Sequence, residues 1–217
     1  WTSKRPNSIR MRTVAIVLPQ RNTGRIIFPT TWARKPVTSN SLAPLSADAP
    51  WIVMKFGGTS VATLPRWQNI RELVASRHAE GARALIVVSA LTGITDALKL
   101  LCNEAEQGKR KDAAQAIVQR HYELLAHMQL EVPAILAERL RDLRELAETG
   151  AGRHAELAWQ AQVQAHGELM SSALGAAFLT HSGLPTQWLD ARECLTAVAL
   201  PNQNERTRLL SSMVDSR

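Results

Sequence analysis

Two apolar segments joined by one amphipathic helix are the feature that most constrains the fold of this chain. Residues 51–56 (WIVMKF) and 84–90 (ALIVVSA) have the length of strands. The second is continuously apolar, which is typical of a strand covered on both faces, as in parallel sheets. Between them, Thr63 and Pro65 mark a helix start and Gly81 a helix end. This order predicts a right-handed parallel crossover.

The remaining pattern predicts an α/β protein with a helix-rich insertion. A third strand is expected at 185–190, and nearly all of the sequence between the second and the third strand reads as helix. One of these helices starts at Pro133, and a long one runs over about 153–180. A last helix is expected over 205–214. The predicted architecture is a three-layer αβα sandwich with a mainly parallel sheet.

The positive charge of the chain is confined to its first segment. The formal net charge is +7, but residues 1–50 hold eight Lys or Arg against one acidic residue, and the rest hold 18 of each sign. A neutral body excludes an extended basic surface for nucleic acid. No apolar run reaches the roughly 18 residues that cross a bilayer, so a membrane protein is also not expected.

Residues 1–50 are expected to form a basic extension with little packed structure. They are rich in Arg, Ser, Thr and Pro and hold only short apolar pieces such as VAIVLP. An organelle transit peptide and upstream sequence translated from a misplaced start both fit this composition. Cys102 and Cys194 lie outside any C-x-x-C or Cys/His cluster, which argues against a disulfide framework and a metal site and favours the cytoplasm.

The first candidate site follows the first strand, at Lys55, Gly57 and Gly58. In an open parallel sheet, ligands bind at the carboxyl ends of strands. Two glycines let the backbone turn sharply, so that N–H groups can point at one anion beside the lysine cation. Such a cradle would neutralise charge during phosphoryl transfer. A plain glycine turn with a solvated lysine is the alternative.

Two further candidates come from the second strand end and from the long helix. Ser89 ends the strand, and Thr95 follows at the start of the next helix, where a hydroxyl can hold an anion or serve as a plain cap, as Asp96 also could. Glu168 shares a helix face with Ser171 and suits a substrate ammonium, or simply faces solvent. The nearby histidine, at position 166, has no nucleophile to activate and is expected to be structural.

The combined motifs resemble the aspartokinase family. The matching segments are KFGGTSVA at 55–62, VVSALTGIT at 87–95, HGELMSS at 166–172 and QWLDAR at 187–192, in the family's order. The sequence of residues 51–217 most resembles the kinase half of the bacterial bifunctional aspartokinase/diaminopimelate decarboxylase. The resemblance implies that 51–217 is the N-terminal portion of a catalytic domain.

The family transfers the γ-phosphoryl group of ATP, with Mg²⁺, to the β-carboxylate of L-aspartate, the first step toward lysine, threonine and methionine. The resemblance implies that Lys55 neutralises the transferring group and that Gly57 and Gly58 cradle phosphate oxygens. It also implies that Ser89 lies near the phosphates, and that Thr95 and Glu168 position aspartate. Asp190 to Arg192 would shape the site, and the intact enzyme would be a homo-oligomer.

The family's chain continues beyond the point that this sequence reaches, with a nucleotide-binding half and regulatory domains. We therefore expect little turnover from this chain alone. Two other functions stay open. The helical region could serve as a non-catalytic interaction module, or the chain could be a different amino acid kinase, such as one for glutamate or acetylglutamate.

Overall fold

The computed structural model describes residues 14–17, 45–46, 48–153, 155–197 and 214–216. The strands are β1 (Val14–Val17), β2 (Trp51–Phe56), β3 (Arg83–Val88), β4 (Gln187–Leu189), β5 (Leu195–Ala197) and β6 (Val214–Ser216). The helices are the 3-10 turn η1 (Gly58–Ser60), α1 (Leu64–Ala79), α2 (Ile94–Asn103), α3 (Gln107–His127), α4 (Ala134–Thr149), α5 (Leu157–His181) and α6 (Ala191–Cys194).

The predicted crossover is confirmed as a parallel β2–α1–β3 unit, with Trp51 opposite Arg83 and Phe56 opposite Val88. The four-stranded sheet has the order β2-β3-β1-β4, and β1 runs antiparallel to both of its neighbours. β5 and β6 form a separate antiparallel pair. The third predicted strand is present as β4, and the helices expected after Pro133 and before His181 are α4 and α5.

Three features differ from the sequence-based predictions. Residues 14–17 of the basic segment form β1 in the sheet, whereas most of 1–50 lies outside the described residues. Val214 begins a strand rather than ending a helix, and 205–213 lie outside the described residues. Thr63 precedes α1 as predicted, but its hydroxyl makes no capping hydrogen bond.

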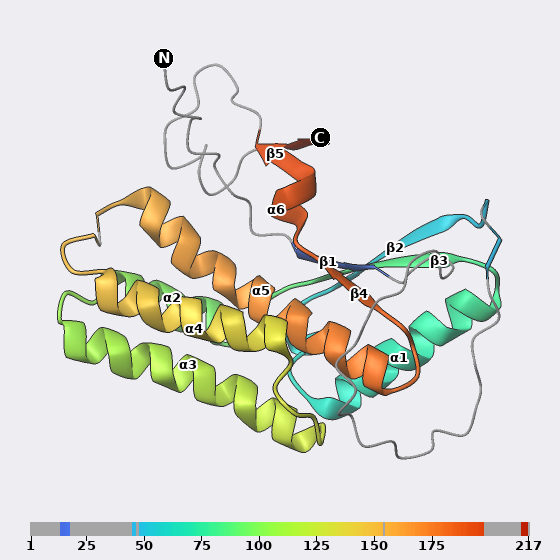
Figure 1. The fold of residues 1–217 in the computed structure, drawn as a ribbon, viewed down its shortest axis with the longest axis horizontal. Coiled ribbons are helices and arrows are strands. Elements are labelled where there is room, and N and C mark those ends of the chain that lie inside the picture. The colour runs from blue at the N-terminus through green and yellow to red at the C-terminus, as the bar shows by residue number, and fades with distance from the viewer. Residues whose placement is uncertain (1–13, 18–44, 47, 154, 198–213, 217) are drawn as a thin grey trace.

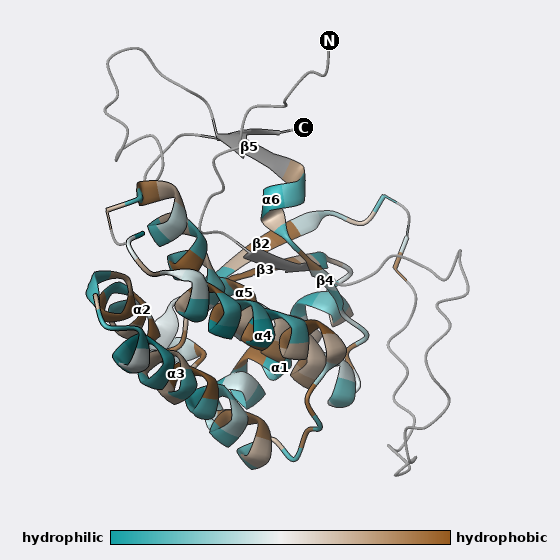
Figure 2. Cartoon of the chain, turned by 60° about the vertical axis from the view of Figure 1, so that its left-hand side comes forward, coloured by the Kyte–Doolittle hydropathy of each residue, from teal (hydrophilic) through white to brown (hydrophobic). Residues whose placement is uncertain are grey.

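The long helices, α1 to α5, lie on one side of the sheet, and the short α6 lies on the other (Figure 1). α1 and α5 lie beneath the strands, and α2, α3 and α4 extend from them as a helical layer (Figure 1). Brown and teal stripes on these helices show apolar sides and polar sides (Figure 2). On the other face, Trp51 is 47% and Val53 63% exposed, so the described residues leave this part of the sheet uncovered. None of the helices among them is long and apolar enough to cross a bilayer.

Trp67 of α1 is the centre of the core. Its side chain is fully buried, and its indole N–H donates to the carbonyl of Val61 at 2.8 Å. A Cβ built on Gly175 of α5 would lie 2.0 Å from the indole ring, so the ring packs directly on the helix backbone. The ring of Phe178 lies 6.3 Å away, centroid to centroid. Trp67 therefore joins α1, the loop after β2 and α5.

His121 is buried in α3 without a charged partner. Its Nδ1–H donates to the carbonyl of Ile117 at 2.8 Å, and Nε2 has no partner among the described residues. Burial lowers the pKa of His121 from 6.5 to about 4; the bond to Ile117 opposes this shift and the charge of Arg120 adds to it. The imidazole is therefore neutral in the folded protein at pH 7.

Two glycines inside helices should respond in opposite ways to alanine. Gly175→Ala should destabilise the protein by about 1–3 kcal/mol or more, because the methyl group collides with the indole. Gly108→Ala in α3 should stabilise it by about 0.5–1 kcal/mol, because its Cβ position is nearly free. Urea unfolding measures both changes, and equal effects of the two variants would contradict this account of the core.

The free energy of unfolding should fall as the pH drops from about 6.5 toward 4. The unfolded chain then binds a proton at His121 that the folded state excludes, so stability present above pH 6.5 is lost. His121→Gln should reduce this pH dependence in urea titrations at pH 7.5, 6 and 5. His127→Gln serves as control, since that exposed side chain lies on the same helix. An unchanged slope in His121→Gln would show that this histidine titrates normally.

Candidate functional site

The carboxyl ends of β2 and β3 meet through their backbones. The N–H of Ser89 donates to the carbonyl of Phe56 at 3.0 Å. A Cβ built on Gly58 would lie 2.7 Å from the carbonyl oxygen of Ala90. The loop 57–61 and the loop 89–93 are therefore in direct contact, as the parallel strand pairing predicts.

Helix α5 contacts the loop that follows β3. A Cβ built on Gly167 would lie 2.7 Å from Cβ of Ala90, so the helix approaches this loop closely. The hydroxyl of Ser171 donates to the carbonyl of Ser89 at 2.8 Å. Glu168 lies between these two contacts along the helix. The segments that carry all six predicted site residues thus converge at one edge of the sheet.

The predicted site residues differ in exposure. Lys55 and Gly57 are exposed, whereas the others are half-buried, namely Gly58, Ser89, Thr95 and Glu168. Within the described part of the chain, the ammonium of Lys55 makes no ion pair or hydrogen bond. This cation stands at the end of β2 and is available to a ligand. The roles of the six residues remain predictions.

Of the two glycines, only Gly58 must be glycine, and for a reason other than the one predicted. Gly57 has φ −76°, and neither Gly57 nor Gly58 has a positive φ, so the turn itself does not demand glycine. Gly58 is required by its close approach to Ala90, whereas a Cβ on Gly57 would meet no atom within 4 Å. The space beside Gly57 is open, as a cradle for a ligand requires.

The plain-cap interpretation of Thr95 and Asp96 is wrong. The N-cap of α2 is Gly93, in the left-handed conformation at φ 82°, and no side chain in the described part of the structure caps this end. Asp96 pairs instead with Lys99 at 3.2 Å. Thr95 lies in the first turn, where its hydroxyl is not used for capping.

A buried ion pair follows β4. The guanidinium of Arg192 binds the carboxylate of Asp190 through Nε at 2.8 Å and Nη2 at 2.5 Å, and the Arg192 N–H adds a bond of 2.9 Å. Burial alone would raise the pKa of Asp190, but the bonds and charge of Arg192 outweigh it and hold this pKa below its usual value. Each charge neutralises the other, so the pair has a structural role at the strand end, in keeping with the shaping role expected for it.

His166 lies on α5 close to the converging loops, but it is neutral. Its Nδ1–H donates to the carbonyl of Gln162 at 2.8 Å. Burial lowers the pKa of His166 to about 4, with a further decrease from Arg192 and Arg139 and opposing effects of the Gln162 bond and of Asp142. At pH 7 the imidazole is uncharged and its Nδ1–H is already used in the bond to Gln162, which agrees with a structural role.

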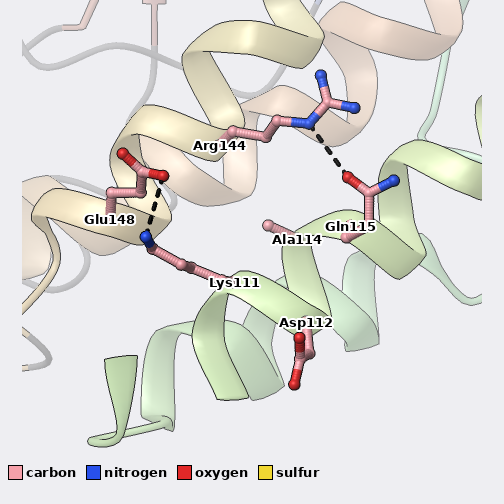
Figure 3. Close-up of a pocket in the computed structure, with 6 residues that line it drawn as sticks. All are labelled: Lys111, Asp112, Ala114, Gln115, Arg144 and Glu148. Atoms are coloured by element: carbon pink, nitrogen blue, oxygen red, sulfur yellow. Dashed lines mark hydrogen bonds and ion pairs between the residues drawn. The ribbon is translucent and has the colours of Figure 1, made fainter. Parts of the chain in front are cut away.

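A surface groove lies elsewhere, between α3 and α4 (Figure 3). It encloses about 220 Å³ and is lined by Lys111, Asp112, Ala114, Gln115, Arg144 and Glu148. None of the predicted site residues lines it. Lys111 pairs with Glu148 at 3.2 Å, and Arg144 donates to Gln115 at 3.2 Å, so its polar groups bind one another across the two helices. The groove is therefore separate from the predicted site residues at the sheet edge.

Sequence reasoning missed the contacts that hold the site together. Ser171 was noted only for sharing a face with Glu168, and Gly167 was not singled out. The spacing of small residues along α5 was the available signal, because small side chains on a buried helix permit close backbone approach. It does not reveal which segment approaches the helix.

Comparisons with known proteins agree with this geometry. The model of the amino acid kinase family matches residues 50–215. The chain is 30% identical over 183 residues to the chloroplastic bifunctional aspartokinase/homoserine dehydrogenase 1 of Zea mays, covering 78% of this chain and 19% of that protein. It is 32% identical over 148 residues to the lysine-sensitive aspartokinase 3 of Escherichia coli, covering 66% of this chain and 32% of that protein.

A solved structure is also similar. Escherichia coli aspartokinase III in complex with lysine and aspartate superposes with a TM-score of 0.51 at 30% sequence identity, covering 63% of this chain and 30% of that chain. This likeness confirms the predicted α/β fold. The chain spans less than a third of the length of each of these matches. The predicted likeness to a decarboxylase fusion stays a prediction.

Alanine substitutions of the two glycines after β2 should have different effects, one on stability and the other on nucleotide binding. Gly58→Ala should destabilise the protein by roughly 1–3 kcal/mol, because the new methyl group displaces the loop at Ala90. Gly57→Ala should leave the urea midpoint nearly unchanged, because its Cβ enters open space, and should weaken nucleotide binding if that space receives a phosphate. Normal nucleotide binding by a well-folded Gly57→Ala would contradict the cradle.

Proposed function

Because the chain belongs to the amino acid kinase family, we propose that it carries the aspartate-binding side of an aspartate kinase and part of its phosphate cradle. In this reaction a β-carboxylate oxygen of L-aspartate bonds to the γ-phosphorus of ATP. The bond from that phosphorus to the β,γ-bridging oxygen breaks, leaving ADP and an acyl phosphate. The convergence of β2, β3 and α5 around Ser89 is the observation that carries the proposal.

Lys55 and the loop after it form the phosphate side. The Lys55 ammonium is exposed and has no partner among the described residues, so it can neutralise charge on the transferring phosphoryl group. Gly57 leaves open space in which backbone N–H groups can approach phosphate oxygens. Ser89 stands at the next strand end, with its backbone fixed on both sides and its hydroxyl directed to no partner in the described structure.

Thr95 and Glu168 form the amino acid side. Glu168 is half-buried on α5, where a carboxylate grips an α-ammonium group more strongly than in bulk water. Thr95 is in the first turn of α2, and its hydroxyl can bind a carboxylate of the substrate because it does not cap the helix. α2 and α5 are packed together, so both residues belong to one rigid wall.

Mg²⁺ would be held mainly by the nucleotide. Among the described residues, no group of three or more His, Cys, Asp or Glu side chains could hold a metal ion. Mg²⁺ binds well to phosphate oxygens and water with one or two carboxylates. It would supply neutralisation of phosphate charge, and this chain's contribution to the same task is Lys55.

The wider setting follows from the same resemblance. The product would enter the synthesis of lysine, threonine and methionine, the enzyme would act in the cytoplasm, and it would assemble as a homo-oligomer. A kinase for glutamate or acetylglutamate is the alternative that the family also contains. The KFGGTSVA segment favours aspartate.

Calorimetric titration of the 217-residue chain tests the amino acid side. L-aspartate should bind more tightly than L-glutamate or N-acetyl-L-glutamate. Glu168→Gln should weaken aspartate binding about tenfold or more, the worth of a charge-assisted hydrogen bond. Glu123→Gln is the matched control, since it changes an exposed glutamate of α3. Equal binding of glutamate, or no effect of Glu168→Gln, would overturn the assignment.

Trapping of the acyl phosphate with hydroxylamine tests the transfer step. Because little turnover is expected from this chain alone, product is collected over long incubations; Lys55→Met should lower this residual aspartate-dependent product formation by about 10²–10³-fold, as for removal of one transition-state donor. Lys111→Met removes a lysine of the α3–α4 groove and should have no effect. If Lys111→Met lowered product formation and Lys55→Met did not, the active site would lie in the α3–α4 groove rather than at the sheet edge.

A further inference from the structure

We propose that Ser171 is a positioning residue: its hydroxyl ties α5 to the end of β3 and thereby sets where Glu168 stands relative to the loops 57–61 and 89–93. The expected effect of Ser171 on aspartate binding rests on the proposed function. The hydrogen bond between Ser171 and Ser89 does not depend on that proposal.

The hydroxyl of Ser171 joins two backbone elements that are distant in sequence. Its side chain is fully buried, and Oγ lies 2.8 Å from the carbonyl oxygen of Ser89 and 3.2 Å from that of Glu168. The hydroxyl has one hydrogen to donate, and the shorter contact identifies Ser89 as its main acceptor. The longer contact is the ordinary one within a helix turn.

Ser89 is the first residue after β3, and both its backbone N–H and its carbonyl form hydrogen bonds. Its N–H donates to the carbonyl of Phe56, the last residue of β2, and its carbonyl accepts from Ser171. One peptide segment therefore links the end of β2, the end of β3 and α5. A displacement of the Ser171 hydroxyl would therefore also displace the ends of β2 and β3.

Glu168 and Ser171 are three residues apart and share one helix face, so they move together. The packing at Gly167 leaves little freedom in the approach of the helix, because Ala90 and Leu98 already lie against its backbone. The hydroxyl of Ser171 fixes the remaining freedom along the helix axis. It can therefore affect how Glu168 meets a ligand without touching the ligand.

Ser172 provides a matched control within the same helix. It is also fully buried, but its hydroxyl donates to the carbonyl of Leu169 at 3.1 Å and accepts from the Trp188 indole at 2.9 Å. It thus holds β4 rather than the end of β3. Replacing either serine with alanine removes one buried hydroxyl from the same part of the core.

The experiment combines ligand-free NMR of the full chain with titration by L-aspartate. Ser171→Ala should shift the backbone amide signals of Gly57 and Thr95 without ligand, and should weaken aspartate binding about tenfold, because Glu168 is no longer held in its binding position. MgATP binding should change less. Ser172→Ala should leave these amides and aspartate affinity unchanged. Ser171→Thr, which keeps the hydroxyl, should restore the affinity; Ser171→Cys, a nearly isosteric weak donor, replaces alanine if that variant does not fold.

The outcomes separate this inference from the proposed function. Unshifted amides in the Ser171 variants, or an equal loss of affinity in Ser172→Ala, would overturn the positioning role. If the wild-type chain binds no aspartate, the proposed function fails, while the ligand-free amide shifts still decide whether Ser171 sets the spacing.

Discussion

The contact between the Trp67 indole and the backbone of α5 at Gly175 determines how the rest of the structure can pack. Only glycine allows the ring to lie on the helix, since a Cβ there would stand 2.0 Å from it. The indole N–H also holds the Val61 carbonyl. One side chain thus places α5 beneath the sheet and fixes the far end of the loop that begins at Gly57. This contact acts together with those at Gly58, Gly167 and Ser171, which hold the loop and the helix at the strand ends.

The site depends on this arrangement because none of its segments could form it alone. The loop after β2 is held at Val61 by Trp67 and at Phe56 by Ser89. The loop after β3 is held between Gly58 on one side and Gly167 on the other. Close backbone approach at two glycines, rather than side-chain interlocking, brings the strand ends and the helix together. This leaves the Lys55 side chain exposed beside a loop that backbone contacts hold in place, which favours the binding of an anion.

Much of this organisation could be predicted from the sequence, because it depends on local patterns. The apolar runs gave β2 and β3 their places, and Pro133 and Gly150 marked the ends of α4. The place of β1 could not be predicted, since four apolar residues in a basic segment do not reveal a partner between β3 and β4. The reason why position 58 must be glycine could not be predicted either. The close approach of Gly58 to Ala90 is a property of tertiary packing rather than of the turn.

The helical layer contains few of the predicted site residues, yet it sets the spacing between two of them. Arg110 is 1% exposed and donates to the carbonyls of Glu104, Ala105 and Ala147. These carbonyls lie near the C-terminal ends of α2 and α4, where a cation is favoured by the helix dipoles. Arg110 thereby joins both helices to α3, and both pack on α5. Since α2 carries Thr95 and α5 carries Glu168, the layer acts as a support that keeps these two residues at a fixed separation while the strand ends are held from the other side.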